Sequence, residues 1–304
     1  MSDTVPRVSV LMTVYNAAPW LREAINSIVC QTYSDWELIV IENGSSDASP
    51  EILASYNDRR IRVIRASENM GRTPALRYAF ELGRGEYTAV LDADDIAEPT
   101  RIAKQVAFLD ANTEVSLVGT WARRIDGDGR EVGLWAPPTD PAQLQDAFGF
   151  ENPIVHSAAM YRAAMAREVG GYPLEFPYAQ DSALWLRLVE RSRVGMIGEY
   201  LSCHRTLPNG MTRSKDARVI VSRDSVALLE YASTHIALSP LSRRRNREER
   251  AIAQCRYAIA LLNIGRFREA LRLVVRAFAA NPRAVVWNRV SRAAILGYAS
   301  GRTE

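Results

Sequence analysis

Short runs of β-branched and aliphatic residues alternate with helical patterns through the first 120 residues, and no other feature constrains the fold as strongly. We predict strands over residues 7–14, 37–41, 61–65 and 87–91. Strand, helix, strand repetition favours parallel strands joined by right-handed crossovers. The chain should therefore begin with an α/β domain.

Three helices are expected between these strands. The first, ending near Val29, repeats apolar residues at the i, i+4, i+8 spacing of an amphipathic helix. The second should begin with Ser49 as N-cap and Pro50 in its first turn, and the third should cover residues 73–82. Further along the chain, we predict strands at 115–120 and 156–161 and a helix at 181–190.

Ligands of parallel α/β sheets bind beyond the carboxyl ends of the strands, so a site is expected in the loops that follow them. These loops are polar: residues 15–18 follow the first strand, 42–47 the second and 92–95 the fourth. The sequence therefore predicts a polar site at one edge of the sheet.

Asp92, Asp94 and Asp95 follow the fourth predicted strand directly. Residues at i and i+2 of an extended segment point to the same side, so Asp92 and Asp94 can face one site. Carboxylates that leave coordination positions open suit Mg²⁺ or Mn²⁺ together with the oxygens of a diphosphate. A short acidic motif also arises by chance as a solvated turn, and the motif alone leaves that alternative open.

The composition is that of an ordinary globular protein, with 47% hydrophobic and 24% charged residues. Cys30, Cys203 and Cys255 form no CxxC pair, so neither a zinc ribbon nor a disulfide framework is indicated, and a cytoplasmic protein is expected. The first residues lack the pattern of a signal peptide, and no apolar run reaches the roughly 18 residues of a membrane span.

Two long stretches carry a resemblance to a known family. VSVLMTVYNAAPWLREAINSIVCQTYSDWELIVIENGSSD and NMGRTPALRYAFELGRGEYTAVLDADD, with the spacing between them, resemble the family 2 glycosyltransferases over about residues 7–205. The resemblance implies the GT-A fold of nucleotide-diphospho-sugar transferases. It also implies transfer of a sugar from a nucleotide-diphosphate donor to an acceptor hydroxyl, with Mn²⁺ or Mg²⁺ as cofactor.

The resemblance assigns residues to the nucleotide. The loop after the first strand supports the nucleotide in this family, which points to Thr13 and Tyr15. An acidic pair after the second strand contacts the base, and Glu42-Asn43 stands here where Asp-Asp is usual. An Asn amide can still pair with a uracil or thymine imide, so a UDP- or dTDP-sugar is favoured, although the departure argues against strict use of UDP.

The resemblance also assigns the diphosphate and the metal. Asp92 resembles the residue near the ribose at the metal site, and Asp94 resembles the direct metal ligand. Arg72 and Arg205 are expected near the donor phosphates, because a guanidinium suits phosphate recognition. An exposed surface position is the alternative for Arg72. The His that often follows two residues after Arg205 is Leu207 here, which removes one family contact from this loop.

On the acceptor side, inverting sugar transfer needs a general base near the acceptor hydroxyl. The family carries an acid before a Trp-bearing helix, and YAQDSALWLRL places Asp181 there, with Gln180 where Glu is commoner. Asp181 also suits a helix N-cap, and the two roles are compatible. His156 matches a His near the acceptor pocket, with a structural role as the alternative. Trp185 is expected in the core, with sugar stacking as the alternative.

A basic helical region is expected over residues 216–304, after a catalytic domain over 1–215. Residues 239–242 indicate a linker, and 253–280 resemble one tetratricopeptide-type hairpin turning at Gly265. Residues 240–304 contain 14 Arg, no Lys and 4 Glu, a net charge of +10 against −7 for the rest of the chain. Such helices can rest on anionic lipid at the inner face of the cell membrane, pair with an acidic partner or simply be solvated; nucleic acid is not expected.

These features predict an inverting, metal-dependent glycosyltransferase acting on a glycan or lipid-linked acceptor in surface polysaccharide or glycolipid synthesis. Nucleotidyl transfer would require a Gly-rich, Lys-bearing phosphate loop that residues 15–19 do not supply. A third hypothesis is a catalytically inactive nucleotide-sugar binder whose basic tail is an interaction module.

Overall fold

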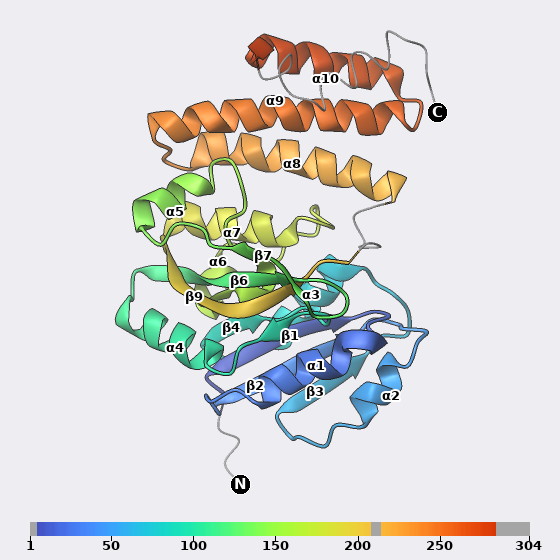
Figure 1. Ribbon diagram of the computed structural model, residues 1–304, viewed down its shortest axis with the longest axis vertical. Helices are drawn as coiled ribbons and strands as arrows, with labels where there is room; N and C mark the ends of the chain where they lie inside the picture. The colour runs from blue at the N-terminus through green and yellow to red at the C-terminus, as the bar shows by residue number, and fades with distance from the viewer. Residues whose placement is uncertain (1–4, 208–213, 284–304) are drawn as a thin grey trace. The chain divides into compact units, whose positions relative to one another are not determined.

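The structure, a computed structural model, describes residues 5–207 and 214–283 (Figure 1). The chain divides into two compact units. The first unit comprises Met1–Gln145 and Asn152–Pro208, and the second comprises Asp146–Glu151 and Asn209–Glu304.

The described part of the first unit holds a nine-stranded mixed sheet in the order β3-β2-β1-β4-β8-β6-β9-β5, with β7 paired to β6. The first four strands run parallel, as the alternating pattern predicted, and β8 runs antiparallel to both β4 and β6. The strands are β1 Val8–Val14, β2 Trp36–Glu42, β3 Ile61–Arg65, β4 Tyr87–Val90, β5 Ile96–Ala97, β6 Val115–Ile125, β7 Glu131–Trp135, β8 Met160–Arg162 and β9 Arg193–Arg205.

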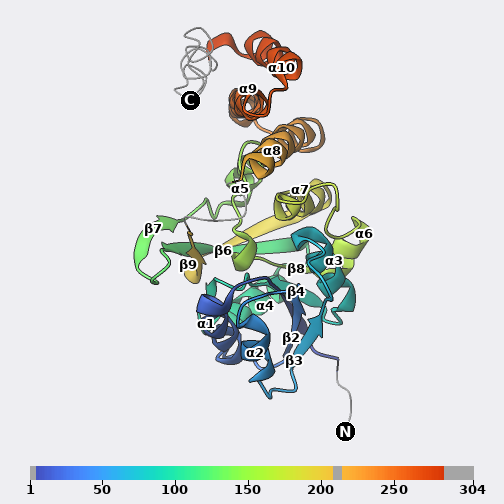
Figure 2. The ribbon, with the colours of Figure 1, turned by 90° about the vertical axis from the view of Figure 1, so that its right-hand side faces the viewer.

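Helices cover both faces of this sheet, and Figure 2 shows α1, α2 and α4 on one face and α3, α6 and α7 on the other. The helices are α1 Ala18–Val29, α2 Ser49–Ala54, α3 Arg72–Leu82, α4 Arg101–Ala111, α5 Pro141–Ala147, α6 Ala163–Glu168 and α7 Gln180–Arg191, with a 3₁₀ helix η1 at His156–Ala158. Alternate residues of β1 pack against α1 and α4, and every residue of β2 is buried, as expected for parallel strands covered on both faces.

Two local predictions were wrong. Ser49 lies inside α2, whose N-cap is Ala48, and the Ser49 hydroxyl accepts a hydrogen bond from the backbone N–H of Ala17 at 3.1 Å. The strand expected at 156–161 begins only at Met160, because η1 precedes it. Side chains of α4 take the backbone carbonyls of η1: Gln105 donates to the carbonyl of Ala158, at 2.9 Å, and Arg101 donates to that of Ser157.

The second unit contains three long helices, α8 Lys215–His235, α9 Pro240–Leu262 and α10 Phe267–Ala280. Ser239 caps α9 through its hydroxyl, so the segment predicted as a linker starts a helix instead. A helix, a turn at Gly265 with φ +78° and a second helix follow one another here, and the likeness to a tetratricopeptide-type hairpin stays a prediction. None of the helices in the described ranges combines the length and the apolar character that crossing a membrane requires. Residues 284–304 of the predicted basic region lie outside the described residues.

Candidate active site

The loops after β1 and β2 are joined by hydrogen bonds. The side chain of Asn16, which has φ +51°, accepts from the backbone N–H of Ser46 at 2.8 Å. The carboxylate of Asp47 accepts from the backbone N–H of Ala18 at 2.9 Å. These contacts bring the two loops to one edge of the sheet, where the sequence placed the site.

Thr13 and Tyr15, the residues expected to support the nucleotide, lie at the carboxyl end of β1. Thr13 is the last but one residue of the strand, in register with Ile41 of β2, and is only partly buried. Tyr15 lies just beyond the strand and is 46% exposed. An exposed aromatic ring at this edge is open to a planar ligand.

Glu42 and Asn43, the expected base contacts, are both buried. The carboxylate of Glu42 accepts from the backbone N–H of Ser45 at 2.6 Å. The Asn43 side chain donates to the backbone carbonyl of Gly71 at 3.3 Å and accepts from the backbone N–H of Met70 at 3.0 Å. Asn43 therefore fixes the turn that leads into α3, a role that sequence reasoning missed.

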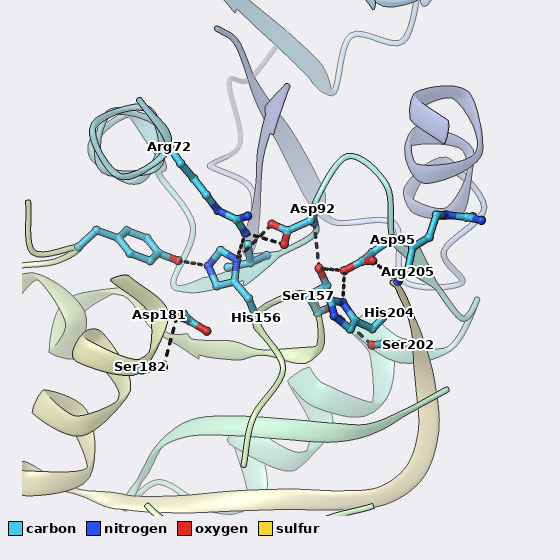
Figure 3. A network of polar contacts seen from close by, with 12 residues as sticks. Arg72, Asp92, Asp95, His156, Ser157, Asp181, Ser182, Ser202, His204 and Arg205 are labelled. Atoms are coloured by element: carbon cyan, nitrogen blue, oxygen red, sulfur yellow. Dashed lines mark hydrogen bonds and ion pairs between the residues drawn. The ribbon is translucent and has the colours of Figure 1, made fainter. Parts of the chain in front are cut away.

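Arg72, Asp92 and His156 form a tight cluster at the start of α3 (Figure 3). The Arg72 Nη2 donates to Asp92 Oδ2 at 2.6 Å, and His156 Nδ1 lies 3.2 Å from Asp92 Oδ1. Burial alone would raise the pKa of Asp92, but Arg72 and His156 together hold it well below its usual value. Both oxygens of Asp92 thus have partners within the protein, and His156, expected on the acceptor side, contacts this predicted donor residue.

Asp94 faces the same site, but not for the reason given by strand alternation. The β4 strand ends at Val90, and residues 92–95 form a turn in which the backbone N–H of Asp95 donates to the carbonyl of Asp92 at 3.1 Å. Burial and the charges of Asp95 and Asp92 raise the pKa of Asp94 to about 7. Among the described residues, no other residue donates a hydrogen bond to its carboxylate.

The side chain of Asp95 anchors the acidic turn formed by residues 92–95. The Ser157 hydroxyl donates to Asp95 Oδ2 and accepts from the backbone N–H of Asp92 at 3.0 Å, so one side chain ties both ends of the turn to η1. His204 Nδ1 lies 3.2 Å from Asp95 Oδ2, and this hydrogen bond raises the pKa of His204. Sequence reasoning missed Ser157 and His204, because their partner Asp95 lies far away along the chain.

Arg205, expected near the diphosphate, is committed to the protein itself. Its side chain is 1% exposed and donates to the carbonyl of Asp94 at 2.7 Å and to those of Asp126 and Gly127 at 3.0 and 3.1 Å. Its Nη2 pairs with Glu23 at 2.6 Å. A buried guanidinium with these partners holds the turn of residues 92–95 in place, and its contact with phosphate stays a prediction.

Asp181 lies in the first turn of α7, one residue inside the helix. The N-cap is Ala179, so the alternative of a helix-capping role is wrong. Asp181 Oδ2 accepts from Asn152 Nδ2 at 3.0 Å. The charge of Asp181, together with those of Asp92 and Asp94, raises the pKa of Arg72, although burial opposes this. The three acids therefore share one electrostatic centre.

The neighbours of Asp181 are buried. Gln180 is 2% exposed, and its Oε1 has no partner among the described residues. Trp185 is fully buried against Tyr161 and His156, at centroid distances of 5.4 and 6.2 Å. The predicted core position of Trp185 is therefore confirmed, and sugar stacking is excluded in this arrangement.

The donor set fits a hard divalent cation that also binds a diphosphate. Within the described ranges, no three His, Cys, Asp or Glu side chains are gathered to hold a metal ion. Mg²⁺ and Mn²⁺ at phosphate sites need only one or two protein carboxylates, because the substrate supplies the other oxygens. Asp94 offers a carboxylate that no other described residue bonds, whereas Asp92 is already paired with Arg72.

Comparisons with known proteins identify the family of the chain. Residues 9–170, more than half of the chain, match the family described as Glycosyl transferase family 2. The chain belongs to this family. An uncharacterized glycosyltransferase of Haemophilus influenzae is 33% identical over 209 residues, which cover 65% of this chain and 64% of that protein. The putative teichuronic acid biosynthesis glycosyltransferase TuaG of Bacillus subtilis is 29% identical over 223 residues, 71% of this chain and 85% of that protein.

Solved structures support the fold of this family 2 glycosyltransferase. The structure of S. aureus TarS 1–349 in complex with UDP-GlcNAc superposes with a TM-score of 0.69 at 16% identity, covering 97% of this chain and 92% of that one. The mannosyltransferase PcManGT of Pyrobaculum calidifontis, in complex with GDP-Man and Mn²⁺, gives 0.61 at 19% identity, covering 99% and 89%. The predicted GT-A fold with C-terminal helices is confirmed.

Proposed function

We propose that this family 2 glycosyltransferase transfers a sugar from a nucleotide-diphosphate donor to an acceptor hydroxyl, with inversion at C1 and with Mn²⁺ or Mg²⁺. One observation carries the proposal: Asp92 pairs with Arg72 at 2.6 Å in the turn that also carries Asp94, and Asp181, from a distant segment, lies near enough for its charge to act on the same Arg72. Three acids around one arginine supply a metal ligand, a partner for that arginine and a base within a single site.

Asp94 would hold the metal ion, which when bound neutralises charge that develops on the leaving diphosphate. Arg72 lies next to it, pinned at Nη2 by Asp92. Its Nη1 has no partner among the described residues, and the side chain is 29% exposed. The Arg72 guanidinium is thus fixed at one end and available to a phosphate oxygen at the other.

Asp181 would act as the general base. Its carboxylate is oriented by the Asn152 amide, which also donates to Ser182. As the acceptor oxygen bonds to C1, the bond from C1 to the diphosphate oxygen breaks and the acceptor proton passes to Asp181. A single displacement of this kind inverts C1. A carboxylate serves here because the acceptor hydroxyl becomes acidic only as the new bond forms.

The donor and acceptor classes rest on the relatives. TuaG is named for teichuronic acid biosynthesis, which favours synthesis of a surface polysaccharide. TarS is seen with UDP-GlcNAc and PcManGT with GDP-Man, so nucleotide sugars of two kinds occur on this fold. We favour a UDP- or dTDP-sugar, because Glu42 and Asn43 stand at the base-contacting position and Asn43 Oδ1 retains a second lone pair.

A thermal-shift panel of UDP-, dTDP-, GDP- and CMP-sugars, with and without Mn²⁺, tests the donor site. Ligand at one hundred times its Kd should stabilise the protein by about 2.7 kcal/mol. We expect a Mn²⁺-dependent shift with one nucleotide, lost in Asp94→Asn. Asp128→Asn is the matched control, because Asp128 is 71% exposed and pairs with Arg130 on a surface turn. The absence of a shift with every donor would overturn the proposal.

The base is tested separately in Asp181→Asn. This variant should bind the donor like wild type, while release of nucleoside diphosphate in the presence of Mn²⁺ falls by about 100-fold or more, since general base catalysis is worth that much. A wild type that binds a donor without releasing nucleoside diphosphate to water or any acceptor would instead favour the inactive nucleotide-sugar binder.

The predicted membrane contact is proposed for α10. Four large apolar side chains on one face of this helix are more than half exposed: Phe267, Leu271, Val275 and Phe278. Exposed arginines border this face: Arg268, Arg272 and Arg276. An apolar stripe beside arginines suits an anionic bilayer surface.

Vesicle sedimentation tests this contact. The full chain should sediment with phosphatidylglycerol vesicles but not with phosphatidylcholine vesicles, and Leu271→Glu should abolish binding. If the protein sediments equally with both kinds of vesicle, or with neither, the proposed contact is contradicted.

A further inference from the structure

A chain of buried polar groups leads away from Asp92 into the protein, on the side opposite the solvent. Tyr161 donates a hydrogen bond to the hydroxyl of Tyr172 at 3.3 Å. The Tyr172 hydroxyl lies 3.1 Å from His156 Nε2, and His156 Nδ1 lies 3.2 Å from Asp92 Oδ1. Both tyrosines are fully buried and His156 is 6% exposed, so water does not compete for these bonds.

Counting donors along this chain fixes the proton on the imidazole. Tyr172 accepts from Tyr161, so its own single proton is directed to His156 Nε2. When His156 Nε2 accepts this hydrogen bond, the proton of the ring is on Nδ1 and points at the carboxylate of Asp92. Arg72 Nη2 lies 3.4 Å from the same Nδ1, and because a guanidinium can only donate, this longer contact competes with a proton on Nδ1. The charged carboxylate of Asp92 lies closer to Nδ1, at 3.2 Å, and accepts the stronger hydrogen bond, so it favours the Nδ1–H tautomer.

The imidazole is held rigidly in this orientation. Its ring packs edge-on to Tyr172, at 5.9 Å and 83° between planes, and tilted against Trp185 at 6.2 Å. Phe80 packs against both tyrosines at 6.0 and 6.3 Å. Burial raises the pKa of Tyr172 well above its usual value, so its proton remains in place.

We propose that His156 is a positioning residue of the donor site: as the Nδ1–H tautomer set by Tyr172, it occupies one oxygen of Asp92 and leaves the other to a single nitrogen of Arg72. The role rests on the proposed donor function. Without the His156 proton, both oxygens of Asp92 are free to form a two-nitrogen pair with Arg72. Such a pair, formed with Nη1 or with the buried Nε that has no partner among the described residues, turns the guanidinium away from its present orientation and so changes what Nη1 offers to the donor phosphates.

Tyr172→Phe tests this idea without changing any residue that meets the donor. Removing the hydroxyl leaves Nε2 without a donor, so the Nε2–H tautomer becomes available and turns a lone pair toward Asp92. We expect the donor Kd with Mn²⁺ to rise by about 10-fold or more, the range for groups that orient a ligand-binding side chain. Tyr87→Phe is the matched control, because it also removes a buried hydroxyl, one that bonds Asp110 at 2.6 Å. It should leave the donor Kd unchanged.

Two variants of the histidine itself separate positioning from packing. The amide of His156→Asn can donate from near the Nδ1 position, whereas that of His156→Gln reaches toward Tyr172. The His156→Asn variant should therefore bind the donor more tightly than the His156→Gln variant. An equal loss in both variants, matching their loss of thermal stability, would show a structural role only.

Nitrogen chemical shifts of ¹⁵N-histidine protein give a readout that needs no donor. The chain has only three histidines, so His204→Gln and His235→Gln assign the spectrum. We expect a protonated Nδ1 in wild type and a shift toward Nε2–H in Tyr172→Phe. A Nε2–H wild type, or a Tyr172→Phe variant with unchanged donor Kd, overturns the positioning role. A wild type of the expected tautomer that binds no donor overturns the proposed function, and the positioning role with it.

Discussion

The guanidinium of Arg205 donates a hydrogen bond to the backbone carbonyl of Asp94 over 2.7 Å, although 111 residues separate the two along the chain. Asp94 is the carboxylate that we propose as the metal ligand, and its turn is shaped by this contact from β9. The resemblance assigned Arg205 to the donor, whereas the structure places it behind the residue that the donor would meet.

Arg205→Lys should therefore unfold more easily. An ammonium group cannot reach the three carbonyls and Glu23 together, and breaking a buried charged contact costs about 3–5 kcal/mol. Arg123→Lys is the control, because Arg123 and Glu131 form an exposed pair worth about 0–1 kcal/mol. Urea denaturation measures the free energy of unfolding of both variants. Weaker donor binding in Arg205→Lys at unchanged stability would instead support a direct contact with phosphate.

Ser157→Ala should loosen the acidic turn while leaving all its carboxylates in place. The Ser157 hydroxyl joins Asp95 to the backbone N–H of Asp92, so its loss leaves that N–H without its partner and leaves Asp95 Oδ2 bonded, among the described residues, to His204 alone. We expect the affinity for Mn²⁺ in the presence of donor to fall by about 10-fold. Isothermal titration calorimetry with Mn²⁺ measures this affinity. Ser27→Ala, which removes a hydroxyl at 3.1 Å from the N–H of Ala97, should show no such loss.

Gly44→Ala should disturb the predicted base pocket more than an ordinary glycine substitution. At φ +75°, an added Cβ would lie 2.9 Å from the backbone nitrogen of Asn69, so the two loops must separate. Gly265 is the matched control, since its φ is +78° and nothing lies within 4 Å of an added Cβ. Gly265→Ala should lose only the backbone term of about 1–2 kcal/mol. Gly44→Ala should lose more and also weaken nucleotide binding; equal losses would exclude a steric role for this loop contact.

Glu37 predicts how stability depends on pH. Burial raises its pKa, but hydrogen bonds from Arg84, Ser9 and Arg62 outweigh this and lower the pKa below 4.5 in the folded protein. A depressed pKa contributes stability that is present above the unfolded value and is lost as pH falls through the folded value. Wild type should therefore be more stable than Glu37→Gln by about 1–3 kcal/mol at pH 7, the cost of losing hydrogen bonds to a buried charged group. The difference should shrink below pH 4.5 in urea melts at several pH values, and a constant difference would contradict this assignment.

Much of the fold follows from local patterns in the sequence. The four parallel strands, the helices between them and the hairpin turning at Gly265 all appear where periodicity and turn residues indicated them. Periodicity works here because each of these elements buries a face of its own. It failed at residues 156–158, where side chains of α4, rather than a neighbouring strand, bond the carbonyls of Ser157 and Ala158.

The sequence by itself determined the alternation of parallel strands and helices in the first part of the chain, and it named the loops and the acids of the candidate site, because these depend on residue type and on short spacing. Only the tertiary structure decided the partners: Arg72 with Asp92, Tyr172 with His156, and Arg205 with the carbonyl of Asp94. A buried charge or hydroxyl is stable only when a partner lies within hydrogen-bond distance. Those partners come from distant segments that meet through packing of the whole sheet, and no local pattern encodes such a meeting.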